Sequence, residues 1–514
     1  MNRTLADVLP VLPTVAVVLL CTALMGWVQF SFDGMHDGDS YFHTRAAREL
    51  DEHGFRDKFP QTAFSTWSVR YSDKDLLFHA FLIPFQRLHR ALSDQETEDL
   101  VTPGKQAAVV LTLVFFVCFA VALHRVDARF PWFWILLLFV ADAPLLFAFL
   151  PVRPGLLAIA FVVVEIVLIL RRKILWLFIV GALHALGHSS FVLLPALATA
   201  WTIAHLLRRE SFSTRLLAVA FLGPILGLIV NPYFPNNLFV AWDQLVEVAR
   251  AVWLGASEVP AHLFGSELVA PRTSQFLGSY PAFLPAVCAL VAFLAYPRRR
   301  LSTEGLALVL MTGLLLGVGF LSERFLRFFF PAAVLLGARL WSELWGNSAL
   351  RESWRDNARA FAFSASILVF SLLGGLADGS VTTVQTHVAG MSTPGIYRPA
   401  VEFLERTAKP DELVYHNFWW DFSVLYHYRP EGRYVVALDP VFFYRFDPEL
   451  FGKSLEAFSG KTEDVYRVLD DDFGARWVFV PKDTRYFPFF NLLRQDSRFE
   501  KAYEDPHVVI VKLR

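Results

Sequence analysis

Long apolar runs separated by short polar segments fill the chain from residue 11 to about residue 376. About eleven such runs can be recognised, near residues 11–30, 106–124, 131–150, 155–170, 174–187, 190–206, 214–230, 277–296, 304–321, 326–343 and 359–376. A helix needs about 20 apolar residues to cross a bilayer, and several runs are somewhat shorter than this. The pattern predicts a polytopic α-helical membrane protein with about 11 transmembrane helices.

Basic residues cluster in alternate connections between these runs, at Arg125/Arg129, 171–173, Arg208/Arg209, 298–300 and Arg351/Arg355/Arg359. If the N-terminus lies inside, a path of eleven spans puts every cluster on the cytoplasmic side, as the positive-inside rule requires. This path needs a hairpin at residues 187–190. An odd number of spans then places the C-terminus outside, so we expect a multi-pass protein of the cell inner membrane with a periplasmic or extracellular C-terminal domain.

Beyond residue 378 the composition becomes that of a soluble domain. Strand-like runs at Leu413–His416, Arg433–Leu438, Trp477–Val480 and Val508–Val511 alternate with helical stretches at Glu463–Leu469 and Phe487–Leu493. This alternation is typical of a small α/β domain. We therefore divide the chain into a transmembrane domain, 1–378, with long external loops at 31–105 and 231–276, and a soluble α/β domain, 379–514.

The composition of the chain narrows the possible classes of function. Hydrophobic residues make up 55% of the chain, and the net charge is −1. A nucleic-acid partner would require a basic surplus, so this class of function is excluded, whereas the lipid bilayer is an obligatory partner. All three cysteines lie in apolar runs, so the outer domain has no disulfide framework.

Candidate chemistry begins directly after the first apolar run. Asp37 and Asp39 stand two residues apart, between His36 and His43. Carboxylates at a membrane surface can hold a cation or a phosphate-bound metal, or take a proton from a hydroxyl or amide. The alternative is a solvated loop that leads into an amphipathic helix.

Two further motifs lie on the same predicted face. Trp419, Trp420 and Asp421 offer a flat apolar platform with N–H donors beside one acceptor, or else an aromatic pair that packs the domain on the membrane. Arg324, with Arg327 one turn further, stands at the outer mouth of the tenth span. A guanidinium there suits phosphate, although an arginine that snorkels from a helix end is equally compatible with the pattern.

Less specific polar groups lie in the apolar runs. Asp142 and Glu165 are the candidates for a transport pathway. His184 and His188 are spaced four residues apart, which can bind a metal, but without a glutamate between them a packed or water-bonded pair is favoured.

Taken in order, these motifs resemble those of the catalytic subunit of oligosaccharyltransferase, a C-type (GT-C) lipid-linked glycosyltransferase. Residues 39–48 are similar to its D-P-Y-F-x-Y-R-x-x-R motif, and 419–421 to its W-W-D-Y-G motif, from which Phe422–Ser423 depart. Arg324 with Pro331 resembles R-x-x-x-x-x-x-P. Ser266–Glu267 resembles S-E-H-Q-P-T, with Glu258 as a rival placement.

The resemblance implies transfer of a sugar or glycan from a polyprenyl-phosphate or polyprenyl-diphosphate donor to a protein, glycan or lipid acceptor on the outer face. It implies a catalytic role for Asp39, with Asp37 as the second candidate, donor-phosphate binding by Arg324 and Arg327, and acceptor binding by the motif at 419–421. Mg²⁺ or Mn²⁺ would be held by Asp39 with Glu267 or Glu258. The alternative function is a non-catalytic lipid-carrier binding protein or flippase.

At one position the chain departs substantially from the motifs of this family. Where the family carries a second acidic motif, D-N-E, this chain has Arg153 within Leu150–Gly155. Octahedral Mg²⁺ or Mn²⁺ would then have few protein ligands, and Arg153 is expected to neutralise donor phosphate instead. The departure argues against metal dependence and against asparagine glycosylation.

Overall fold

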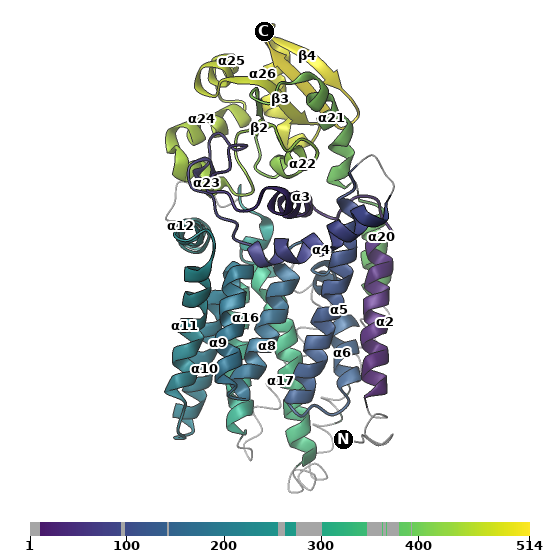
Figure 1. The fold of residues 1–514 in the computed structure, drawn as a ribbon, viewed down its shortest axis with the longest axis vertical. Helices are drawn as coiled ribbons and strands as arrows, with labels where there is room; N and C mark the ends of the chain where they lie inside the picture. The colour runs from purple at the N-terminus through teal and green to yellow at the C-terminus, as the bar shows by residue number, and fades with distance from the viewer. Residues whose placement is uncertain are drawn as a thin grey trace.

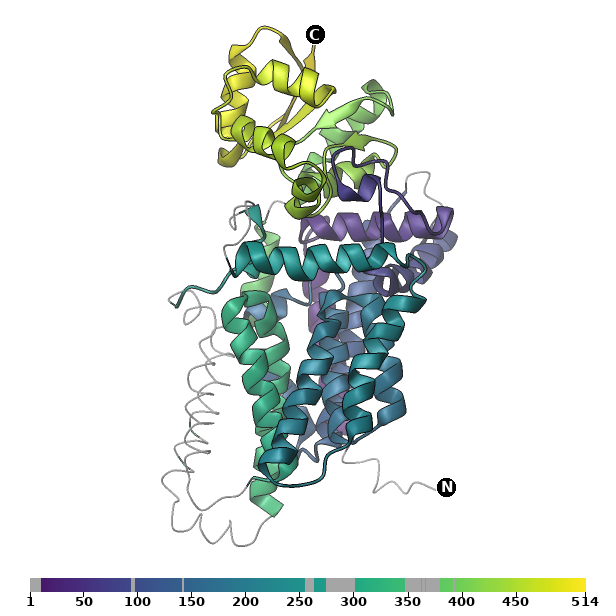
Figure 2. The same cartoon turned by 90° about the vertical axis from the view of Figure 1, so that its left-hand side faces the viewer.

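The computed structural model describes residues 11–93, 98–140, 143–254, 263–273, 301–346, 362, 366, 380–391 and 393–514. Long helices stand side by side in a bundle, and the C-terminal domain covers one end of it (Figure 1). We call this the outer end and the opposite end, near the N-terminus, the inner end. The described parts of the two predicted external loops and the C-terminal domain lie at the outer end (Figures 1 and 2).

Five helical segments of the described chain are long and apolar enough to cross a membrane: Leu12–Gln29 (α2), Val101–Arg125 (α5), Ser189–Leu207 (η2 with α10), Thr303–Leu321 (α16) and Glu323–Glu343 (η6 with most of α17). Four shorter apolar helices are Pro131–Val140 (α6), Gly155–Leu170 (α8), Ile174–Gly187 (α9) and Thr214–Val230 (α11). A helical fold with several candidate membrane spans is therefore confirmed. The predicted span at 277–296 and nearly all of that at 359–376 lie outside the described residues, so the count of about 11 stays a prediction.

At two places the predicted boundaries of the spans can be compared with the helices of the structure. The hairpin at 187–190 is confirmed, because α9 ends at Gly187 and α10 (Leu193–Leu207) follows the short 3-10 helix η2 (Ser189–Val192). The run at 131–150 is described as two pieces, α6 and the short helix α7 (Ala143–Phe147), and a loop then leads to α8. That loop carries Arg153.

A layer of helices lies across the outer end of the bundle, between it and the C-terminal domain (Figure 2). The layer contains α3 (Gly38–His53), α4 (Leu76–Leu92) and the continuous helical segment of α12 (Asn236–Trp242), η3 (Asp243–Glu247) and α13 (Val248–Val252). The side chain of Asp37 caps α3 by accepting a hydrogen bond from Ser40 N at 3.0 Å, and α3 is followed by Gly54, whose φ of 68° suits glycine.

The C-terminal domain is built on a five-stranded sheet of order β2-β1-β3-β5-β4. Strand β1 (Leu413–Tyr415) is parallel to β2 (Arg433–Tyr434) and to β3 (Ala475–Pro481), whereas β5 (Val508–Leu513) is antiparallel to β3 and to β4 (Phe499–Glu504). Its main helices are α21 (Arg398–Thr407), α22 (Asp421–Tyr428), α23 (Pro440–Phe446), α24 (Pro448–Phe458) and α26 (Phe487–Gln495). The preceding helix α20 (Ser380–Ala389) packs against α2 and α7 of the bundle.

Backbone hydrogen bonds join this domain to the first external loop. Ala63 N donates to Tyr434 O at 2.8 Å, and Tyr434 N donates to Gln61 O at 2.7 Å. Arg45 of α3 adds a bond from its Nε to His427 O at 2.9 Å. Because these bonds link segments far apart in sequence, they fix α3 relative to the sheet.

Helices α9 and α11 approach each other through glycines. A Cβ on Gly223 would lie 2.7 Å from Phe178 O, and one on Gly227 would overlap Ala182 O. Small residues permit such close backbone approach between membrane helices, where dispersion contacts take the place of the hydrophobic effect.

We expect Gly227→Ala to destabilise the protein by about 1–3 kcal/mol, because the added methyl group would overlap a backbone carbonyl that cannot move alone. Gly313→Ala in α16 is the matched control, since a Cβ there meets nothing within 4 Å. Thermal unfolding of the detergent-purified variants provides the measurement. Equal midpoints for the two variants would contradict the close approach of α9 and α11.

Candidate functional site

Three segments meet around one guanidinium at the outer end of the bundle. Arg153 Nη1 lies 3.1 Å from Asp37 Oδ2, and its Nη2 lies 2.8 Å from Asp39 Oδ2 and 3.5 Å from Glu267 Oε1. Asp37 and Asp39 belong to the start of α3, and Glu267 to the 3-10 helix η5 (Ser266–Leu268). The four side chains are only 21–25% exposed, which strengthens their interactions relative to those of surface ion pairs.

The carboxylate of Glu267 also accepts hydrogen bonds from the two arginines at the outer mouth of α17 (Leu326–Gly346). Arg324 Nε donates to its Oε1 at 3.0 Å, and Arg327 Nη2 donates to its Oε2 at 2.9 Å. Burial raises the pKa of Glu267, but the three guanidiniums outweigh burial and hold this pKa well below its usual range. Asp37, Asp39, Arg153, Glu267, Arg324 and Arg327 form what we call the outer charge cluster.

The two aspartates of the cluster have different surroundings. Asp37 is the helix cap, and the hydroxyl of Ser40 that bonds to it also accepts a hydrogen bond from Val152 N at 2.9 Å. Asp39 bonds, among the described residues, to Arg153 alone. Burial raises the pKa of Asp39 in spite of the opposing charge of Arg153. Asp39 therefore retains carboxylate lone pairs for a further partner, whereas Asp37 uses its carboxylate both to cap α3 and to pair with Arg153.

The W-W-D motif lies beside this cluster although it is nearly 400 residues away in sequence. Gly38, between the two aspartates, lies so near to the motif that a Cβ on it would be 3.6 Å from Trp420 O. Trp419 Nε1 donates to Leu263 O at 2.9 Å, which ties the domain to the segment that leads to Glu267. The hypothesis that an indole packs the domain on the membrane part therefore fits Trp419.

Trp420 and Asp421 face different environments. The Trp420 ring stacks on Phe418 with centroids 3.9 Å apart, and the Arg485 guanidinium lies 4.7 Å from the Trp420 centroid. Asp421 is buried at the start of α22, where it accepts a hydrogen bond from Tyr486 Oη at 2.7 Å, and burial raises the pKa of Asp421 to about 7. Of the two, Trp420 is half-buried and Asp421 is buried.

Two charged residues near the cluster were given no role by the sequence analysis. Asp439 caps α23, accepts a hydrogen bond from Gln244 Nε2 at 2.8 Å, and has a pKa that burial raises. Lys74 and Arg324 both act electrostatically on Asp439, and Lys74 acts on Asp39 as well. Lys74 stands in an ordinary polar string, 73–75, so the sequence contained no signal for it.

A buried polar chain supports α3 from below. His79 Nδ1 donates to Asp73 Oδ2 at 2.6 Å, and His43 Nδ1 lies 2.8 Å from His79 Nε2. Burial lowers the pKa of His79, but Asp73 outweighs burial and raises it, whereas burial lowers the pKa of His43 well below its usual range. His43 follows Asp39 by one helical turn, so this chain fixes the turn that carries Asp39.

The histidine pair of α9 is satisfied inside the protein. His184 Nδ1 lies 2.8 Å from Glu165 Oε1, and Ser190 Oγ lies 2.8 Å from both His184 Nε2 and His188 Nδ1. These contacts agree with a packed pair rather than a metal site. Asp142 lies outside the described residues.

The carboxylates of the outer charge cluster do not fit a metal ion in this arrangement. The guanidinium of Arg153 takes the position between them that a cation would need, and no three His, Cys, Asp or Glu side chains of the described residues are grouped to hold a metal. Glu258, the rival ligand of the sequence analysis, lies outside the described residues.

No protein-family profile matches the chain, and no curated protein matches it in sequence. In structure it is similar to the archaeal oligosaccharyltransferase AglB of Archaeoglobus fulgidus in complex with an inhibitory peptide and a dolichol-phosphate. The TM-score is 0.67 at 10% identity over 94% of this chain and 71% of AglB. For AglB tethered with an acceptor peptide that contains the NVT sequon, the TM-score is 0.64 at 11% identity over 95% and 72% of the two chains.

The chain is also similar to ArnT of Cupriavidus metallidurans bound to undecaprenyl phosphate, with a TM-score of 0.56 at 13% identity over 97% of both chains. AglB and ArnT are both GT-C glycosyltransferases. The chain therefore has the GT-C fold, which confirms the resemblance deduced from the motifs.

The position of Arg153 leads to a prediction about metal binding. Arg153→Ala should free the carboxylates of Asp37, Asp39 and Glu267 as hard oxygen ligands, so we expect it to bind Mn²⁺ about tenfold or more tightly than wild type. Electron paramagnetic resonance of Mn²⁺ titrated into the purified protein gives the two affinities. Arg153→Lys, which keeps a cation, is the control. Equally tight binding by wild type would show that the guanidinium does not occupy a cation position.

Proposed function

We propose that this protein is an inverting glycosyltransferase that moves a sugar from a polyprenyl-phosphate or polyprenyl-diphosphate carrier to an acceptor at the outer end of the bundle. The observation that carries the proposal is the outer charge cluster: three guanidiniums converge on Glu267, one of them, Arg153, also pairs with Asp39, and the W-W-D motif lies next to them. The GT-C fold supports it, as do the dolichol-phosphate and undecaprenyl phosphate in the complexes of AglB and ArnT. In this proposal the outer end faces the periplasm or cell exterior.

The donor phosphate is assigned to the arginines. Arg324 and Arg327 lie at the mouth of α17, where a lipid phosphate at the membrane surface can approach, and guanidiniums bind phosphate oxygens through paired hydrogen bonds. When the bond between the sugar C1 and the phosphate oxygen breaks, its electron pair stays on phosphate. Arg153 and the two arginines stabilise this developing charge, which is an electrostatic contribution already in place before the reaction.

The acceptor is assigned to the opposite side of the sugar. An acceptor nucleophile, which we take to be a hydroxyl or amide, rests against Trp420 and attacks C1 from the face opposite the phosphate, so the configuration inverts. Its proton passes to Asp39, whose raised pKa suits a general base better than a fully solvated carboxylate would. The polar chain of His43, His79 and Asp73 holds that turn of α3 in place.

No step of this mechanism passes through a metal ion, because Arg153 supplies positive charge where the carboxylates converge. This feature favours transfer of a single sugar to a glycan or lipid over en bloc transfer of an oligosaccharide to protein. The flippase alternative needs the arginines but not Asp39, which makes Asp39 the decisive residue.

We expect Asp39→Asn to lower the transfer rate by about 10²–10⁴ while donor binding stays nearly intact, because the amide cannot accept the proton. Asp33→Asn, at an exposed site in the same segment, is the matched control and should retain full activity. Turnover with a verified lipid-linked donor and acceptor, together with donor titration, measures both effects. Wild-type turnover in Asp39→Asn would remove Asp39 from the reaction, and lipid translocation by a variant without transferase activity would favour a flippase.

Arg324→Ala and Trp420→Ala should separate donor from acceptor binding. Loss of charge-assisted hydrogen bonds to phosphate costs about 1.5–3 kcal/mol, so Arg324→Ala should weaken donor binding about tenfold or more. Trp420→Ala should leave donor affinity unchanged and raise the acceptor concentration needed for half-maximal rate. Titration of each variant with donor, then with acceptor at saturating donor, measures both. The assignment is wrong if a folded Trp420→Ala loses donor binding, or if Arg324→Ala does not.

A further inference from the structure

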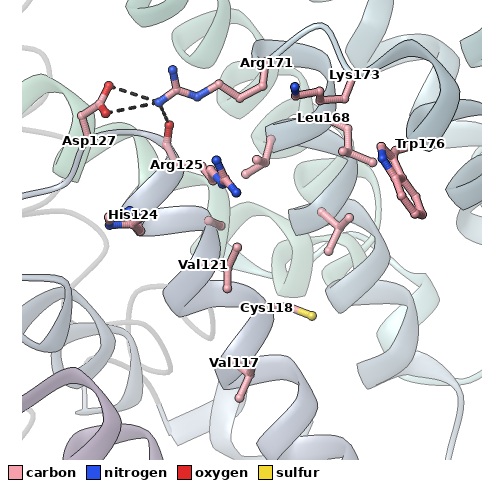
Figure 3. Close-up of a pocket in the computed structure, with 13 residues that line it drawn as sticks. Val117, Cys118, Val121, His124, Arg125, Asp127, Leu168, Arg171, Lys173 and Trp176 are labelled. Atoms are coloured by element: carbon pink, nitrogen blue, oxygen red, sulfur yellow. Dashed lines mark hydrogen bonds and ion pairs between the residues drawn. The ribbon is translucent and has the colours of Figure 1, made fainter. Parts of the chain in front are cut away.

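A pocket lies at the inner end of the bundle, far from the outer charge cluster. It has a volume of about 690 Å³ and lies between α5 and α8, with residues of the α8–α9 connection and the start of α9 on its rim. Figure 3 shows its two parts: basic side chains gather at one end, and Val117, Cys118 and Val121 extend away from them along α5. None of the residues that line this pocket takes part in the site described above.

The walls of this inner-end pocket are apolar and open sideways. Val117 and Val121 of α5 are about half exposed, and Trp176 of α9 is 59% exposed. Because α5 is long and apolar enough to span a membrane, these exposed side chains face lipid rather than water. Trp176 near the helix end agrees with the preference of tryptophan for the membrane–water boundary.

The basic rim is only partly neutralised. Arg171 Nη2 donates to both carboxylate oxygens of Asp127 at 3.2 Å. Arg339 Nη1 also donates to Asp127 Oδ2, at 2.9 Å. Arg125 and Lys173, in contrast, have side chains that form no hydrogen bond or ion pair with any other described residue. Two exposed cations therefore stand at the membrane end of an apolar groove.

We propose that this pocket binds one anionic phospholipid from the leaflet at the inner end. The phosphate of this lipid would lie between Arg125 and Lys173. The part of an acyl chain nearest the headgroup would lie along Val117, Val121 and Leu168. Basic pockets between transmembrane helices are suited to anionic headgroups, and an apolar groove open to the bilayer admits the attached chain. A free phosphate would use the cations but leave the groove unfilled, so the lipid uses more of the observed surface.

The test uses the full-length protein, purified in detergent and depleted of lipid, and the double variant Arg125→Gln/Lys173→Gln. Native mass spectrometry titrates each with phosphatidylglycerol and, separately, with phosphatidylethanolamine. Each juxtamembrane cation contributes about 1 kcal/mol to the attraction for an anionic surface, so we expect the double variant to bind phosphatidylglycerol about ten- to thirtyfold more weakly. Arg215→Gln, an exposed arginine at the inner end but outside the pocket, should bind as wild type does.

Three results of these titrations, and one result of a competition experiment, would overturn the proposal. Wild type could bind both lipids equally, the double variant could retain its affinity, or Arg215→Gln could lose as much as the double variant. Competition by millimolar inorganic phosphate would assign the pocket to a free anion and overturn the lipid assignment. An unchanged thermal midpoint verifies that each variant is folded. Transferase activity plays no part in these measurements, so the result is independent of the proposed function.

Discussion

The contact of one guanidinium with three carboxylates organises the outer end of this protein. Arg153 comes from the loop before α8, Asp37 and Asp39 from the start of α3, and Glu267 from η5, so one side chain joins three segments that are distant in sequence. Removal of one partner from a poorly hydrated ion pair leaves an uncompensated charge, which is costly. The conformations of the three segments are therefore interdependent.

Glu267 determines what this arrangement can bind. It holds Arg324 and Arg327 as well as Arg153, and its depressed pKa keeps it ionised, so protonation cannot release the arginines near neutral pH. In the proposed reaction, a phosphate must exchange with Glu267 for these donors. The guanidiniums would then already be desolvated and oriented, and little reorganisation would accompany binding.

The sequence predicted the parts of the fold that depend on local pattern. The hairpin at 187–190 was predicted from the apolar runs and the basic clusters together, because neither pattern is sufficient by itself to place it. Strand β4 was missed, because Phe499–Glu504 is a charged edge strand in which a single buried residue leaves no clear alternation. The run at 433–438 was predicted as one strand, but only Arg433–Tyr434 is a strand, and the segment 61–64 of the distant external loop hydrogen-bonds to Tyr434 and Val435.

For the site, the sequence identified which residues belong to it better than it identified what surrounds each side chain. The motifs pointed to Asp39, Arg153, Glu267 and Arg324, and these residues do meet in space. The motif at 39–48 ranked Asp39 above Asp37, but no pattern showed that Asp37 caps a helix, because capping depends on where the helix begins. Similarly, the consecutive residues Trp419, Trp420 and Asp421 face a loop, an aromatic stack and the domain interior in turn.

The same contacts explain why a soluble domain can contribute to a site at the membrane surface. A separate domain moves relative to its neighbour unless the interface is fixed. Here the domain is held through backbone bonds to residues 61–64, through Arg45 of α3 and through Trp419, while Ser40 bonds α3 to the loop of Arg153. The short helix α3 therefore lies between the arginines at the bundle and Trp420 on the domain, and it carries Asp39 between them. Because a reacting group misplaced by about 1 Å can lose much of its rate, this bracing matters as much to the proposed chemistry as the charges themselves.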